Sequence, residues 1–168
     1  TPNSFSDGGS FNTGLSFSSQ AQMLLKQGVE VLDIGAESTA PFNSPITASL
    51  EWERLESTLV PFLREWPKGV MLSLDTYQIE TIVKISELCS ERGIDLWWND
   101  ISGDTKSARA VLKEFPKLGY VLCHNLAPDR SLAQSHMKFL LEGNPVEQLT
   151  SYFSSRIQSL AGLKNPLL

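Results

Sequence analysis

Polar side chains stand where four short apolar runs of the sequence end, and their types suit an active-site rim. These residues are Glu37, Ser38 and Thr39 after the first run, Asp75 after the second, Asn99 and Asp100 after the third, and His124 and Asn125 after the fourth. Carboxylates, amides and an imidazole can bind a polar heterocycle, orient a substrate or move a proton. One such residue is usually a loop cap, but the same pattern at four of four run ends favours a functional edge.

The four runs read as β-strands, and helical patterns lie between them. The expected strands are VEVLDI (29–34), VMLSLD (70–75), LWWNDI (96–101) and YVLCHN (120–125), with NPLL (165–168) opening one more. We expect five helices. The first begins at a cap on Ser18 or Ser19 and stops at Gly28, and the second spans 48–66 with a kink at Pro61. The third and fourth span 78–92 and 106–116, and the last begins at Asn144-Pro145. Strands separated by helices predict parallel pairing, in an open doubly wound sheet or a β/α barrel. In either architecture the carboxyl edge of the sheet carries the site.

Other common sites are excluded by their missing signatures. No G-x-G-x-x-G follows the first strand, and no glycine loop ends in lysine and serine or threonine. His124 and His136 are the only histidines, too few for a multi-histidine zinc site. His124 is equally consistent with a hydrogen-bonded structural residue and with a pocket residue. No Ser–His–Asp arrangement is apparent from spacing.

Composition indicates one globular domain with a packed core. The chain has 168 residues, 41% hydrophobic and 20% charged, and a net charge of −5 without a basic stripe, which argues against nucleic-acid binding. We see neither an apolar run long enough to span a bilayer nor a signal peptide. Cys89 and Cys123 are expected as buried, reduced thiols of a cytoplasmic protein.

Four motifs in order carry a family resemblance. They are TPNSFSDGG (1–9), DIGAESTAP (33–41), SLDTY (73–77) and NDISG (99–103). Together they resemble dihydropteroate synthase, a folate-pathway enzyme with a pterin-binding β/α barrel. The resemblance implies a (β/α)8 TIM barrel, of which residues 1–168 would form a partial pterin-binding domain with about strands 2–5 and their flanking elements. A complete barrel needs about 250 residues, so we expect the sequence to be part of a longer enzyme and inactive by itself.

The resemblance also implies a reaction. The family condenses 7,8-dihydropterin-6-ylmethyl diphosphate with p-aminobenzoate and releases diphosphate. By motif position, Asp75 and Asn99 would line the pterin slot, and Thr39 would contact the substrate. The p-aminobenzoate pocket would be shaped by loop residues Thr1, Pro2, Ser4, Phe5 and Pro41. Asp33 and Glu37 are expected to be carboxylates of the barrel scaffold. Mg2+ is the implied cofactor, with its asparagine ligand preceding residue 1 and no metal ligand within this chain, and the implied assembly is a homodimer.

The chain departs from the family pattern at several positions. Asn3 stands where aspartate is usual, and Ala40 stands where an arginine would contact phosphate. Trp97 and Trp98 replace small β-branched residues, and alternation along a strand predicts one ring in the barrel and one toward the helices. Two alternatives stay open: a non-catalytic or divergent pterin-binding paralogue, which Ala40 favours, and a methyltetrahydrofolate-type methyltransferase, which the SFSDGG loop disfavours.

Overall fold

The computed structural model describes residues 14–38, 44–128, 130–139 and 143–168. Its helices are α1 (Gly14–Lys26), α2 (Ala48–Phe62), α3 (Ile79–Arg92), α4 (Thr105–Glu114) and α5 (Pro145–Ser159), with 3-10 segments η1 (Leu63–Glu65) and η2 (Arg130–Phe139). Its strands are β1 (Val31–Gly35), β2 (Met71–Asp75), β3 (Leu96–Asp100) and β4 (Gly119–Leu122). No helix in this part of the chain is long and apolar enough to cross a membrane.

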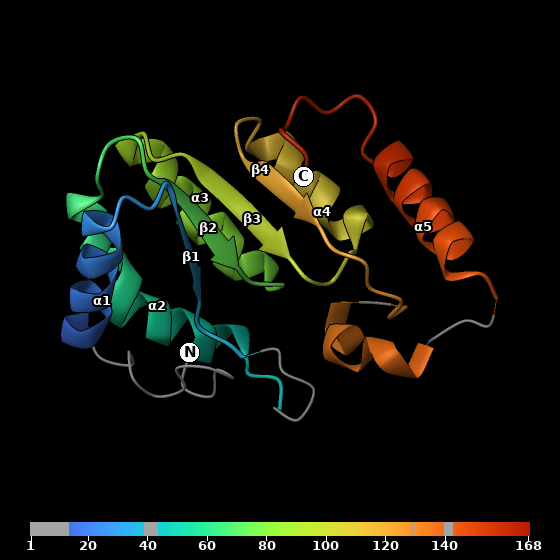
Figure 1. The fold of residues 1–168 in the computed structure, drawn as a ribbon, viewed down its shortest axis with the longest axis horizontal. Helices are drawn as coiled ribbons and strands as arrows, with labels where there is room; N and C mark the ends of the chain where they lie inside the picture. Colours follow the sequence, from blue (N-terminus) through green and yellow to red (C-terminus); the bar gives the residue numbers. More distant parts are fainter. Residues whose placement is uncertain (1–13, 39–43, 129, 140–142) are drawn as a thin grey trace.

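The strands form one parallel sheet in the order β1-β2-β3-β4, with a helix in each crossover (Figure 1). A doubly wound sheet would reverse its strand order at a switch point, whereas a β/α barrel adds each strand beside the last. The observed order therefore selects the barrel over the doubly wound alternative. The sheet is part of a β/α barrel, as the sequence predicts.

Most predicted elements are confirmed, with changed boundaries. Gly93 ends α3 in the left-handed conformation at φ 67°, and the side chain of Asn144 caps α5 by accepting a hydrogen bond from the Val146 amide. The helix predicted over 48–66 ends at Phe62 and continues as a 3-10 turn, so Pro61 lies in its last turn. The prediction of a helix start at Ser18 or Ser19 is wrong, because α1 already begins at Gly14.

The region after β4 differs most from prediction. β4 ends at Leu122, so Cys123, His124 and Asn125 lie beyond the strand. The polar stretch that follows contains η2, for which no element was predicted. Near the chain end, Leu167 bridges Tyr120 in parallel, which confirms NPLL as the opening of a further strand.

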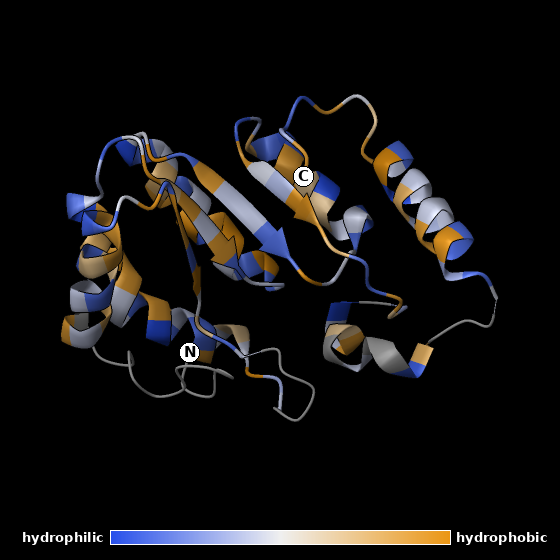
Figure 2. Cartoon of the chain, viewed as in Figure 1, coloured by the Kyte–Doolittle hydropathy of each residue, from blue (hydrophilic) through white to orange (hydrophobic). Residues whose placement is uncertain are grey.

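One face of the sheet packs against α2, α3 and α4 and forms the main core. Its strand residues are Leu72, Leu74, Leu96, Trp98, Tyr120 and Leu122. Figure 2 shows β3 changing from a hydrophobic start to a hydrophilic carboxyl end, where Asn99 and Asp100 lie. The packed helices thus hold the strands rigidly while their polar ends converge at one edge.

The opposite face, called here the inner face, carries the alternate strand residues, among them Asp33, Ser73, Asp75, Trp97 and Asn99. Trp98 is fully buried on the helix side, and Trp97 lies over Gly119 on β4, where any Cβ would collide with the indole ring. The prediction that the two tryptophan rings lie on opposite faces of the sheet is confirmed. The ring of Trp97 also explains why position 119 is a glycine. Cys89 and Cys123 are both free, with Cys123 only partly buried.

Candidate functional site

Asp75 and Asn99 meet at the carboxyl edge of the inner face. They are direct partners in the parallel register of β2 and β3, so their side chains leave neighbouring strands on the same side. The amide of Thr76 donates to the Asn99 carbonyl at 3.2 Å, which extends the pairing one residue further. The sequence-predicted pair is thus brought together by strand register.

One oxygen of the Asp75 carboxylate has no hydrogen-bond partner in the described part of the chain. This oxygen, Oδ1, is buried. Burial, and then the nearby carboxylates led by Asp33 and Glu51, raise the pKa of Asp75 from its ordinary 3.8 to about 7. A buried, unsatisfied acceptor of this kind is costly to the fold and is typical of a binding site.

Gly35 makes room for this carboxylate. It pairs with Asp75 across β1 and β2, and a Cβ at position 35 would approach Asp75 Oδ2 to 3.4 Å and its Cβ to 3.3 Å. The nearest atom would be the backbone carbonyl oxygen of Asp75 at 3.2 Å, which is tighter than ordinary packing, so alanine would push on the backbone and Cβ of Asp75. The glycine of DIGAEST therefore has a steric role beside the site.

Asn99 offers the complementary amide. Its Oδ1 receives a weak contact from the Cys123 thiol at 3.7 Å, and its amide nitrogen donates no hydrogen bond among the described residues. Burial, followed by the carboxylates of Asp100, Asp75 and Asp33, raises the pKa of Cys123 to about 11, so the sulfur is a thiol near neutral pH. The pair thus presents an acceptor carboxylate next to a donor amide, which matches the edge of a heterocycle with both N–H groups and acceptors.

The scaffold role predicted for Glu37 is confirmed. Glu37 is buried and accepts hydrogen bonds from the Ile46 amide at 3.2 Å and from the Tyr77 hydroxyl at 2.9 Å. Asp33 accepts a hydrogen bond from its register partner Ser73 on the inner face. The Asp33 contact joins β1 to β2, and the Glu37 contacts join the segment after β1 to Ile46 and to Tyr77 after β2.

The two polar residues after β4 serve packing rather than the Asp75–Asn99 pair. Asn125 is buried and donates to the carbonyls of Ile101 and Ala133 at 2.7 and 2.9 Å. His124 packs edge-on against Tyr152 of α5, with ring centres 4.7 Å apart, and its buried Nε2 has no partner in the described chain. These contacts include no hydrogen bond to His124 and do not place it beside Asp75, so both interpretations of His124, structural residue and pocket residue, stay predictions.

The remaining predicted site residues lie outside the described residues. They are Thr1, Pro2, Ser4, Phe5, Thr39 and Pro41, together with the divergent positions Asn3 and Ala40.

Two charged residues behind the site, the buried Glu51 and the partly buried Arg130, were missed by sequence reasoning. Glu51 in α2 is fully buried and accepts a hydrogen bond from the Thr76 hydroxyl at 2.9 Å. Glu51 lies four residues before Leu55 and eight before Leu59, which places it on the apolar face of the helix. This spacing is a signal from which its burial could have been predicted. Arg130 of η2 binds Asp100, and no pattern in its polar segment marks it.

Metal-binding side chains do not cluster in the described part of the chain. Within the described residues, no three histidine, cysteine, aspartate or glutamate side chains gather closely enough to hold a metal ion. The asparagine that the family resemblance implies as the Mg2+ ligand would precede residue 1, so the Mg2+ site stays a prediction.

Comparisons with known proteins agree with this geometry. A folate synthesis bifunctional protein from Chlamydia trachomatis is 29% identical over 96% of this chain and 35% of its own length. A dihydropteroate synthase type-2 from Escherichia coli is 28% identical over 96% of this chain and 55% of its own length. A crystal structure of dihydropteroate synthase from Anaplasma phagocytophilum with bound 6-hydroxymethylpterin-monophosphate superimposes with a TM-score of 0.72 at 25% identity, covering 91% of this chain and 59% of that one.

The chain thus spans about a third to a little over half of the length of these relatives. The family model described as pterin binding enzyme matches residues 1–164, nearly the whole chain. The protein therefore belongs to the family of pterin binding enzymes.

Proposed function

We propose that the protein is a dihydropteroate synthase, a transferase of folate biosynthesis. The observation that carries the proposal is the Asp75–Asn99 pair, a buried unsatisfied carboxylate beside a free amide donor at the carboxyl edge of a pterin-family barrel. Similarity to relatives named dihydropteroate synthase supports it.

In the proposed reaction the pterin lies along the inner face with its N–H edge toward Asp75. The C–O bond to diphosphate breaks, the amine of p-aminobenzoate forms the new C–N bond, and the amine proton is released. Asp75 accepts hydrogen bonds from the pterin and stabilises positive charge that develops as diphosphate leaves. Asn99 fixes the orientation of the ring by donating to one of its acceptors.

The rest of the proposal follows the family. Thr39 contacts the substrate, and Thr1, Pro2, Ser4, Phe5 and Pro41 shape the p-aminobenzoate pocket. The chain forms the N-terminal and middle part of a longer barrel, which acts as a cytoplasmic homodimer and is a sulfonamide target. An asparagine that precedes residue 1 would hold Mg2+.

The test is an assay of diphosphate release by the complete gene product, with and without p-aminobenzoate. We expect wild-type release to depend on p-aminobenzoate and to fall at least a hundredfold in Asp75→Asn, because the variant lacks the charge that stabilises the transition state. Asp95→Asn is the matched control: Asp95 is exposed at the opposite end of β3 and should leave turnover unchanged. Pterin binding without turnover would instead identify the non-catalytic paralogue, and Ala40→Arg would then be the first variant to restore activity.

A further inference from the structure

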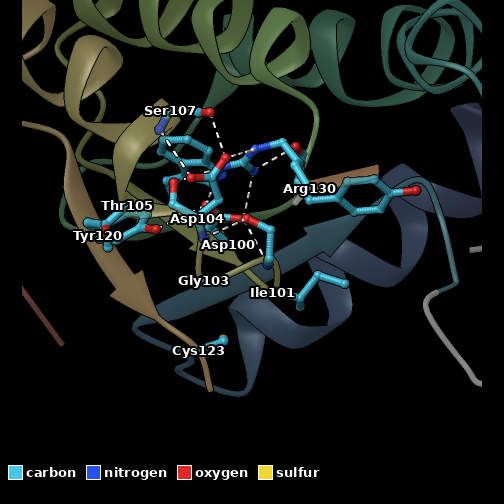
Figure 3. A network of polar contacts seen from close by, with 12 residues as sticks. Asp100, Ile101, Gly103, Asp104, Thr105, Ser107, Tyr120, Cys123 and Arg130 are labelled. Carbon is cyan, nitrogen blue, oxygen red and sulfur yellow. Dashed lines mark hydrogen bonds and ion pairs between the residues drawn. The ribbon is translucent and has the colours of Figure 1, made fainter. Parts of the chain in front are cut away.

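Arg130 reaches from η2 to the ends of two strands that lie far from it in sequence (Figure 3). Its guanidinium donates two parallel hydrogen bonds of 2.8 Å to the Asp100 carboxylate, one from each terminal nitrogen. The Arg130 side chain is 14% exposed and that of Asp100 is fully buried. The segment between β4 and α5 is thereby anchored beneath the carboxyl edge of the sheet.

Asp100 holds the end of β3 on the side opposite the substrate face. Besides Arg130, it accepts hydrogen bonds from the Tyr120 hydroxyl at 3.0 Å and from the Ser102 amide at 3.0 Å. Asn99 immediately precedes it, and strand alternation points the Asn99 side chain to the inner face. A fixed Asp100 therefore fixes the backbone from which Asn99 projects.

The same guanidinium also holds the end of β2. The nitrogen that donates to Asp100 Oδ1 donates to the Tyr77 carbonyl at 2.7 Å, two residues after Asp75. The guanidinium carbon lies 5.4 Å from the centre of the Trp98 ring, and Trp98 in turn donates to the Thr76 carbonyl at 2.7 Å. One side chain thus links the two strand ends that carry the candidate pterin-binding pair.

We propose that Arg130 is a positioning residue that sets the spacing of Asp75 and Asn99, and through it the affinity for the pterin ring. This inference rests on the proposed function. A planar guanidinium can bind a carboxylate with two hydrogen bonds and still donate to a carbonyl, which a lysine ammonium cannot do with the same geometry. Since a buried ion pair contributes little net stability compared with apolar packing, its main effect here is to define geometry.

The test combines a double-mutant cycle with a matched control in the complete gene product. The variants are Arg130→Gln, Asp100→Asn, their combination, and Arg130→Lys, which keeps the charge should the glutamine variant fold poorly. Arg109→Gln is the control, because Arg109 likewise donates to two carbonyls, those of Ser159 and Ala161, but joins α4 to the end of α5. Affinity for 6-hydroxymethylpterin is measured by calorimetry, together with the melting temperature.

We expect Arg130→Gln and Asp100→Asn each to weaken pterin binding about tenfold. The double variant should bind no worse than Arg130→Gln, because that variant already removes the guanidinium bonds to Asp100, Tyr77 and Asp104. Arg130→Lys should fall between wild type and Arg130→Gln. Arg109→Gln should bind within about twofold of wild type even where its melting temperature drops equally.

Hydrogen exchange supplies a measurement that needs no ligand. The amide of Thr76 bonds to the Asn99 carbonyl and that of Ser102 to Asp100, so both should exchange faster in Arg130→Gln and Arg130→Lys but not in Arg109→Gln. Unchanged exchange and unchanged affinity in variants with a lowered melting temperature would overturn the inference and leave Arg130 a merely stabilising residue. Wild-type protein that binds no pterin would contradict the proposed function instead, and exchange at these two amides would still decide whether Arg130 holds the strand ends.

Discussion

Replacing Asp75 with asparagine should stabilise the folded protein above neutral pH while it removes turnover. The residue is partly buried, its Oδ1 is buried without a hydrogen-bond partner among the described residues, and other carboxylates lie near it. Folding therefore favours the protonated acid, and deprotonation destabilises the native state. Asparagine has nearly the same shape and does not titrate.

The magnitude follows from the pKa of Asp75, which rises from 3.8 in an ordinary environment to about 7, chiefly through burial. A raised carboxyl pKa means that stability is complete below pH 4 and is lost as the pH rises toward 7. At about 1.4 kcal/mol per pH unit, the ceiling of the loss is about 4 kcal/mol. Because Asp75 is only partly buried and titrates together with its neighbours, we expect about half of this, or roughly 5 °C in melting temperature.

The assay is the melting temperature of wild type and Asp75→Asn at pH 4 and pH 8, with Asp95→Asn as control. The two proteins should melt alike at pH 4, and the variant should melt higher at pH 8. A variant that is less stable at pH 8, or a difference that does not change with pH, would refute the account of Asp75 as a destabilising carboxylate. A gain in stability combined with a loss of turnover would mark Asp75 as a residue kept for function.

Three further substitutions test the surroundings of the site. Burial raises the pKa of Glu51 to about 7, so Glu51→Gln should raise the melting temperature at pH 8 and leave it unchanged at pH 4; an equal change at both pH values would contradict this. Gly35→Ala should cut kcat/KM more than tenfold with a small loss of stability, since the Cβ of the alanine presses on Asp75. Wild-type kinetics of this variant would show that the site does not need the space left by Gly35. Gly103→Ala should cost about 2 to 3 kcal/mol in chemical denaturation, because φ is +60° and the Tyr152 hydroxyl and Cys123 carbonyl occupy the Cβ position; an unchanged midpoint would disprove this conflict.

Local signals in the sequence were enough to predict the order of most elements and the set of polar residues at the strand ends. Gly93 and Asn144 end and begin helices through their own backbone and side-chain preferences, which act within one helical turn. Asp75 and Asn99 were among eight polar residues at the ends of apolar runs, and parallel strands bring their carboxyl ends to one edge. These inferences need only the period of a strand and the direction of the chain. The resemblance to dihydropteroate synthase singled out these two as the residues of the pterin slot.

What only the tertiary structure decided is the support of that pair. Arg130, Glu51 and Gly35 act on the strand ends that carry Asp75 and Asn99 from 25 to 40 residues away along the chain. The pairs are Thr76–Glu51 (25), Arg130–Asp100 (30) and Gly35–Asp75 (75 − 35 = 40). The packing of the helices on the sheet decides whether a buried glutamate accepts a hydrogen bond from a hydroxyl. It also decides whether one arginine can bind two strand ends at once. Hydrogen bonding and steric fit are short-range in space but not in sequence, so the site residues follow from the sequence pattern and their positioning follows only from the packed fold.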